Sequence, residues 1–141
     1  MNLRTLKQLG GKNILQREIR NDHDLLEAIK AGIPSLAIDY WIKDRKISKT
    51  SIAKFLGITP KTLERTKDKK LAQREGDAFV QLVDLFAFGE EVLGKKEIFL
   101  QWIHTENAAL AFKKPIDLLH TSIGRETVRT VLGRIEYGIY S

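Results

Sequence analysis

The 141-residue sequence contains no cysteine, which excludes disulfide bonds and thiolate metal sites. It also lacks any run of about 18 apolar residues, so no membrane span is predicted. No stretch alternates apolar and polar residues as a strand does, and the three prolines all stand where helices are expected to begin. The apolar fraction of 43% is sufficient for a core without covalent cross-links. These features predict an all-α protein.

Residue patterns for catalysis are absent as well. His23, His104 and His120 are far apart and have no neighbour at metal-ligand spacing. The sequence has no Gly-x-Ser-x-Gly motif, and Gly10-Gly11-Lys12 lacks the rest of a phosphate-binding loop. We therefore predict a protein that is not an enzyme and that needs no metal or cofactor. The N-terminus has no signal-peptide apolar stretch, which predicts a cytoplasmic location.

The pattern of residues 49–66 is typical of a helix-turn-helix, two short helices joined by a tight turn. Ala53 is small enough for the second helix to pass close to the first. Gly57 suits the left-handed backbone of a helix end. Thr59 can cap the second helix, and Pro60 fits its first position, where no N–H is needed. The apolar face expected to hold the helices together consists of Ile52, Leu56, Ile58 and Leu63.

The second helix of this motif is expected to turn basic and hydroxyl side chains outward, because Leu63 and Thr66 face inward. Such side chains bond to phosphates and base edges. The residues predicted to contact DNA are Thr59, Lys61, Thr62, Arg65 and Lys69. A helical hairpin without DNA-binding function can carry the same Ala-x-x-x-Gly and apolar pattern, so that interpretation stays open.

Charge is distributed unevenly along the chain. Residues 1–70 hold sixteen Lys and Arg against eight Asp and Glu, a net charge of +8. Residues 71–141 hold eight against ten, a net charge of −2. A basic half that contains the helix-turn-helix favours a polyanionic partner such as nucleic acid. The alternative is a basic face that is only solvated.

Apolar spacing predicts the remaining helices. They are expected from Asp22 to Gly32, from Pro34 to about Arg45, over 73–93 up to Gly94, around 98–103, from Pro115 through Leu119, and over a final segment with Val128, Val131, Leu132 and Ile135 facing inward. On the final helix, Arg129, Gly133, Tyr137 and Tyr140 form a second stripe. Tyrosine and arginine are enriched in protein–protein hot spots, which favours a binding surface. The alternative is that the tyrosines only cover the end of a core helix. Trp41 and Trp102 are both expected in the core.

Three segments near the end of the chain carry a family resemblance: Asn107–Leu110, Lys114–Leu119 and Gly133–Ser141, with Trp102 ahead of them. With the preceding helix-turn-helix, they resemble the Xre/MbcA/ParS-like antitoxins, and more closely the Xre antitoxins encoded beside RES-domain toxins. The resemblance covers roughly residues 22–141, and the closing Arg-Ile-Glu-Tyr-Gly-x-Tyr-Ser is its most specific part. One departure is Ala111-Phe112-Lys113, which stands where the family usually has a Gly-rich turn. This departure bears on the geometry expected for the turn and on which partner the chain is expected to bind.

The resemblance implies that the chain neutralises a cognate RES-domain toxin, which depletes cellular NAD+, and represses the shared operon. It implies a helix-turn-helix DNA-binding region at residues 22–70 and a helical toxin-binding domain at residues 71–141. Residues 1–21 are expected to form a flexible basic arm. The residues expected to bind the toxin are Arg129, Arg134, Glu136, Tyr137, Tyr140 and Ser141. A homodimer would suit operator DNA with paired half-sites.

Two other functions remain open from the sequence. The chain could be a stand-alone transcriptional regulator whose C-terminal half dimerises or senses a small molecule. It could also be an antitoxin that keeps the helix-turn-helix as a scaffold without binding DNA.

Overall fold

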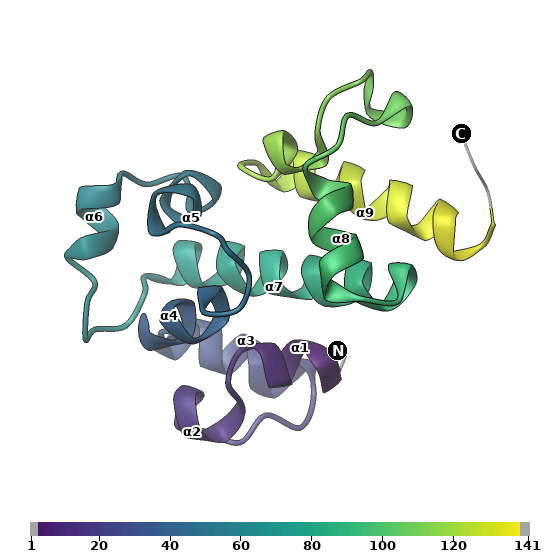
Figure 1. Cartoon of the computed structure of the whole chain (residues 1–141). Helices are drawn as coiled ribbons and strands as arrows, with labels where there is room; N and C mark the ends of the chain where they lie inside the picture. The colour runs from purple at the N-terminus through teal and green to yellow at the C-terminus, as the bar shows by residue number, and fades with distance from the viewer. Residues whose placement is uncertain (1–2, 139–141) are drawn as a thin grey trace. The chain divides into compact units, whose positions relative to one another are not determined.

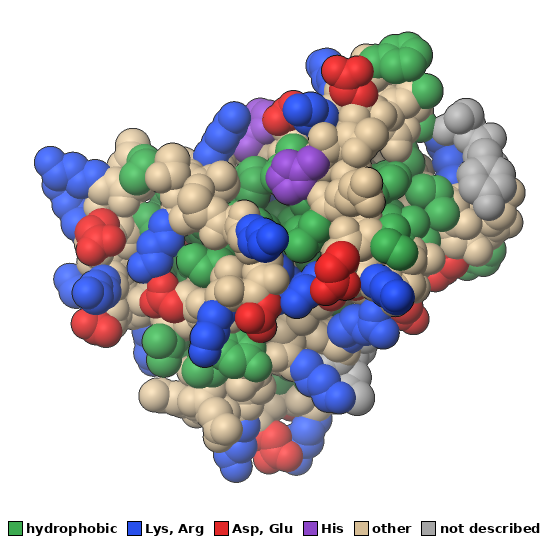
Figure 2. Space-filling model, in the orientation of Figure 1, with side chains coloured by type: hydrophobic (Ala, Val, Ile, Leu, Met, Phe, Trp, Pro, Cys, Tyr) green, Lys and Arg blue, Asp and Glu red, His purple; other side chains and the backbone are tan. Residues whose placement is uncertain are grey.

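A computed structural model describes residues 3–138, and every regular element in this part of the chain is helical (Figure 1). The elements are α1 (Leu3–Gln8), α2 (Gly11–Leu15), α3 (Asp22–Ala31), α4 (Leu36–Ile42), α5 (Lys49–Leu56), α6 (Pro60–Glu64), α7 (Gln73–Leu93), α8 (Lys96–Ile103), the 3-10 turns η1 (Ala108–Leu110) and η2 (Pro115–Leu118), and α9 (Ser122–Glu136). The prediction of an all-α fold is confirmed. On the face drawn in Figure 2, hydrophobic atoms reach the surface in small patches among charged and polar ones.

Contacts divide the chain into two compact units, Met1–Val83 and Asp84–Ser141. The first unit contains α1 to α6 and the first half of α7. The second contains the end of α7, α8, the two 3-10 turns and α9. The boundary between them therefore falls inside a helix and not in a loop.

The core of the first unit is built around Trp41 of α4, which is fully buried. Its ring meets Phe79 of α7 edge-on, with the ring centroids 5.8 Å apart. Its indole N–H donates to the side-chain oxygen of Gln8 in α1 at 3.0 Å. A buried indole needs such a partner, because an unpaired N–H away from water is costly. The prediction that Trp41 belongs to the core is confirmed.

The first residues of the chain differ from the flexible arm expected for residues 1–21. From Leu3 onward the structure shows two short helices, α1 and α2. Leu9 is fully buried and Leu15 nearly so, and Gln8 supplies the acceptor for Trp41. The apolar burial and this hydrogen bond offset the entropy lost when a segment with few helix signals becomes ordered.

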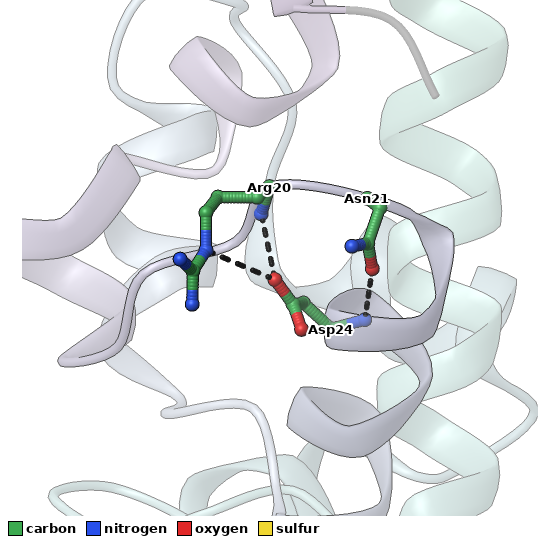
Figure 3. Close-up of polar contacts among 3 residues, drawn as sticks. All are labelled: Arg20, Asn21 and Asp24. Carbon is green, nitrogen blue, oxygen red and sulfur yellow. Dashed lines mark hydrogen bonds and ion pairs between the residues drawn. The ribbon is translucent and has the colours of Figure 1, made fainter.

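The start of α3 shows why that helix begins where the sequence predicted (Figure 3). The Asn21 side-chain oxygen accepts from the backbone N–H of Asp24 at 2.8 Å. The Asp24 carboxylate accepts in turn from the backbone N–H of Arg20 at 3.0 Å, and the Arg20 guanidinium lies 3.7 Å away. These bonds satisfy N–H groups that a helix start leaves unpaired. At the other end, Gly32 takes a φ of 107° and ends the helix, as predicted.

In the second unit, α8 packs on the end of α7 through aromatic rings. Phe86 and Phe99 are both fully buried and meet edge-on at 4.9 Å. Trp102 stacks on Phe99 at 6.1 Å but is only partly buried, so it lies at the margin of the core. The predicted inward face of α9 is confirmed: Val128 and Leu132 are fully buried.

The start of α9 depends on one glycine. Thr121 caps the helix by accepting from the Gly124 N–H at 2.9 Å. A Cβ atom at position 124 would lie 1.7 Å from the Leu118 carbonyl oxygen, so only glycine lets η2 pass this close. Beside it, Arg125 is 7% exposed and its guanidinium donates to the Leu119 carbonyl at 2.9 Å. These contacts fix where α9 begins relative to η2.

Candidate functional site

The helices α5 and α6 have the local structure that the sequence predicted for residues 49–66. The Ser48 hydroxyl accepts from the Ser51 N–H at 3.1 Å and caps α5. Gly57 adopts φ 74° and ends α5, as expected of a left-handed helix end. Thr59 accepts from the Thr62 N–H at 3.1 Å, and Pro60 occupies the first position of α6. Sequence reasoning therefore placed both caps and the turn correctly.

The residues predicted to contact DNA are all exposed, while Leu63 is buried beneath them. Two of the five also have a structural role, because the Thr59 and Thr62 hydroxyls lie 2.9 Å apart and are hydrogen-bonded. Since α6 is only five residues long, Arg65 stands at its end and Lys69 lies in the following turn. Lys and Arg side chains, with acidic ones between them, cover this part of the molecule around α6 in Figure 2.

An ion pair joins the start of α5 to α4. The Lys49 ammonium lies 2.9 Å from the Asp39 carboxylate, and both side chains are nearly half exposed. The hydrogen bond to Asp39 raises the pKa of Lys49 above its usual range, partly opposed by burial. The pair fixes the entry to α5, although an exposed pair of this kind contributes little to stability.

On α9, the predicted toxin-binding residues fall into two groups. Arg129 is engaged within its own unit: its guanidinium donates to Asp84 at 3.0 Å and lies 4.6 Å from the Phe88 ring centroid. The other group projects into solvent: Arg134 and Glu136 are exposed, and Tyr137 is 79% exposed. Tyr140 and Ser141, the remaining two of this prediction, lie outside the described residues.

Gly133 occupies an open position in the last turn of α9. No heavy atom lies within 4 Å of where its Cβ would be, so packing within this unit does not explain a glycine here. It costs about 1 kcal/mol of helix stability relative to alanine. The open position leaves room for another backbone to approach.

Sequence reasoning missed two exposed apolar side chains in the second unit. Phe112 is 68% exposed and Ile123 is 81% exposed. Their exposure is set by tertiary packing, and the signal available for Phe112 was the Lys113–Lys114 pair that follows it between η1 and η2. It also missed the buried Arg125, which a charge-based expectation would place at the surface.

Within residues 3–138, none of the helices combines the length and the apolar character that a membrane span requires. No group of three or more His, Asp or Glu side chains within residues 3–138 is arranged to hold a metal ion.

Comparison with known proteins gives two matches. Residues 88–138 match the family described as the antitoxin Xre/MbcA/ParS C-terminal toxin-binding domain. A curated relative, "Antitoxin Xre" from Yersinia enterocolitica (serotype O:8 / biotype 1B, strain NCTC 13174 / 8081), is 28% identical over 120 residues, covering 83% of this chain and 81% of the relative. Both matches are with antitoxins, which supports the prediction of a non-enzymatic protein. The chain is thus similar to the Xre/MbcA/ParS antitoxins over its C-terminal toxin-binding segment and, at lower identity, to an Xre antitoxin over most of its length.

Proposed function

We propose that this chain is the antitoxin of a type II toxin–antitoxin pair and that its second unit binds and neutralises a toxin with a RES domain. The observation that carries the proposal is the match of residues 88–138 to a toxin-binding domain. This segment contains the end of α7, α8, both 3-10 turns and α9.

The mechanism is inhibition by burial. The exposed end of α9 presents Arg134, Glu136 and Tyr137 together, followed by Tyr140 and Ser141 in the sequence. A tyrosine at the end of a helix carries a large apolar ring and a hydroxyl that can donate or accept. Inserted into the entrance of a toxin active site, this segment would exclude substrate without any chemical step by the antitoxin.

The RES assignment depends on the closing segment of the chain. Its Arg-Ile-Glu-Tyr-Gly-x-Tyr-Ser pattern resembles that of Xre antitoxins encoded beside RES-domain toxins. A RES toxin depletes NAD+, so the antitoxin would protect the NAD+ pool of the cytoplasm in which both act. A measurement of cellular NAD+, in addition to growth, therefore tests whether the toxin is a RES-domain protein.

The first unit would bind operator DNA and repress the operon that encodes both proteins. Its α5–α6 hairpin exposes Lys61 in the first turn of α6 and Arg65 at the C-terminal end of that helix, with Lys69 in the next turn. The side chains of Lys and Arg neutralise phosphates and release counterions, which supplies much of the affinity of DNA-binding proteins. A homodimer would place two such hairpins on half-sites about 34 Å apart.

Expression of the adjacent toxin gene, with and without this chain, tests the antitoxin function. Alone, the toxin should stop growth and lower cellular NAD+, and co-expression of the chain should restore both. A co-expressed variant ending at Ile135 should fail to restore either. Restoration by this truncated chain would rule out the closing segment as the inhibitory element.

Binding measurements with the same chain distinguish the proposed function from the two other functions that the sequence leaves open. If the chain binds no product of the adjacent gene but still binds DNA upstream of its own gene, it is a stand-alone regulator. If it restores growth but binds no DNA in a mobility-shift titration, the hairpin is a scaffold.

A further inference from the structure

The segment from Asn107 to Lys113 forms a closed loop between α8 and η2. The Asn107 N–H donates to the Lys113 carbonyl at 3.0 Å, and the Phe112 N–H donates to the Asn107 carbonyl at 2.9 Å. The Asn107 side chain also accepts from the Ala109 N–H at 2.9 Å. Leu110 is buried and anchors the loop from inside. The loop is therefore held by its own hydrogen bonds and by the burial of Leu110.

Two consecutive residues at the tip of this loop have a left-handed backbone. Ala111 has φ 54° and Phe112 has φ 63°, a conformation that is easy for glycine and unfavourable for side chains with a Cβ. An aromatic residue is among the least suited to it. The side chains at positions 111 and 112 therefore strain the backbone. The turn itself does not require this strain, because glycine at either position would form the same turn without it.

The strained position presents a hydrophobic ring to solvent. Phe112 is 68% exposed, while Leu110 before it in the loop and Pro115 after the loop are buried. Lys113 and Lys114 follow it and are exposed. In Figure 2, hydrophobic atoms and charged side chains lie together at the outer end of this segment, at the top of the view. The ring is held outward on a closed turn and contributes little to the core.

We propose that Phe112 is a pre-positioned anchor that enters an apolar pocket with an acidic rim on the toxin. The inference rests on the proposed function and adds a second contact, separate from the closing segment, that determines which toxin is bound. Its location supports this occupant, because residues 107–113 lie inside the segment that matches a toxin-binding domain. An aromatic anchor on a rigid loop loses little conformational entropy on binding.

The charges beside the ring specify the chemistry of the pocket. The second unit has a net charge of −1, with seven Lys and Arg against eight Asp and Glu over residues 84–141. Within this slightly acidic unit, Lys113 and Lys114 form a basic pair that follows Phe112 directly. A pocket that accepts the ring would therefore have carboxylates at its edge, which would reject partners with a basic rim.

The test compares two glycine substitutions in the same turn. Phe112→Gly removes the ring and the strain, and Ala111→Gly removes strain only. Both variants should melt a few degrees higher, about 3 °C, than the original chain. In titrations of the full chain with the purified product of the adjacent toxin gene, F112G should bind about thirty-fold more weakly or worse, and A111G within about threefold of the original. Higher stability with weaker binding excludes misfolding as the cause.

Further outcomes decide the proposal. Phe112→Leu, which keeps an apolar side chain, should retain most of the affinity, and Ile123→Ser should leave it unchanged. If F112G binds the toxin as tightly as the original chain, the proposal that Phe112 is an anchor is wrong, while the proposed function stands. If F112G changes only the self-association of the free chain in sedimentation, the loop is an interface between copies and the anchor is again wrong. If the original chain itself does not bind the toxin, the proposed function fails first.

Discussion

The two units of this chain differ most clearly in charge, since each exposes some large apolar side chains, among them Leu26 and Leu36 in the first unit. Residues 1–83 carry seventeen Lys and Arg against ten Asp and Glu, a net charge of +7, and α6 presents Lys61 and Arg65 to solvent. Residues 84–141 are close to neutral and expose Phe112, Ile123 and Tyr137. Charge acts over a distance and is screened by salt, whereas aromatic burial needs close contact and is affected little by salt.

This difference predicts how the two binding activities respond to the same conditions. Binding of DNA by the first unit should weaken steeply as salt increases, because counterion release drives it. Binding of the toxin by the second unit should weaken much less. A salt titration of both activities on one preparation therefore distinguishes a chain with two specialised surfaces from a chain with one general basic surface.

The largest expected effect is on the stability of the second unit and comes from two glycines of α9, one tightly packed and one facing open space. Gly124→Ala should destabilise the second unit by about 3 kcal/mol, since its Cβ would collide with the Leu118 carbonyl. Gly133→Ala should stabilise it by up to about 1 kcal/mol, because the space there is open. Thermal and denaturant unfolding measure both. If G133A also weakens toxin binding despite its higher stability, Gly133 lies in the interface; unchanged toxin binding would remove it from the interface.

The next effect concerns the basic face of α6. Replacing Lys61 and Arg65 together by alanine should lower affinity for operator DNA about tenfold or more and reduce the salt slope by about 2. Stability should change little, because both side chains are exposed. The matched control, Lys12→Ala with Lys30→Ala, removes the same charge from exposed positions on α2 and α3. Equal losses in both double variants would mean that net charge, and not α6, controls binding.

A smaller effect is expected at Arg129, which pairs with Asp84 and lies over Phe88. Arg129→Met should cost at most about 1 kcal/mol, since the ion pair is one-third or more exposed. Asp84→Asn breaks the same ion pair but keeps the arginine. Isothermal titration with the toxin then separates two roles: loss of affinity in R129M alone assigns Arg129 to the interface, and equal loss in both assigns it to positioning α9 on α7.

The smallest effect is expected at the Lys49–Asp39 pair. Asp39→Asn should cost only a few tenths of a kcal/mol, about 0.5 at most, because both side chains are nearly half exposed. The pKa of Lys49 is raised in the folded chain, so this contribution is complete below the unfolded pKa and is lost as the pH rises through the folded value. The stability difference between the variant and the original chain should accordingly disappear in strongly alkaline buffer. A difference that persists there would show that the pair acts through something other than charge.

Much of the fold follows from local chemistry. The caps at Ser48 and Thr59, the left-handed Gly57 and the full extent of α7 were all predictable, because each depends on residues within a few positions of one another. The exposure of Lys61 and Arg65 followed from the same helical geometry. Local signals of this kind survive folding because the tertiary structure agrees with them.

The features that sequence reasoning missed depend on distant contacts or on rare backbone conformations. The order of residues 3–15 depends on the bond between Gln8 and Trp41, which are 33 positions apart. Burial of Arg125 depends on the path of η2. The left-handed backbone at Phe112 breaks the usual preference of its residue type, so propensity argues against it. Such violations concentrate at functional sites.

The division of the chain inside α7 has a practical consequence for dissecting the protein. A cut between Val83 and Asp84 would sever a 21-residue helix near its middle. Each fragment would then carry a fresh helix end whose four outermost backbone groups have lost their partners. Neither half can be released by trimming a linker, so fragments that keep the whole of α7 are the ones expected to express as folded material.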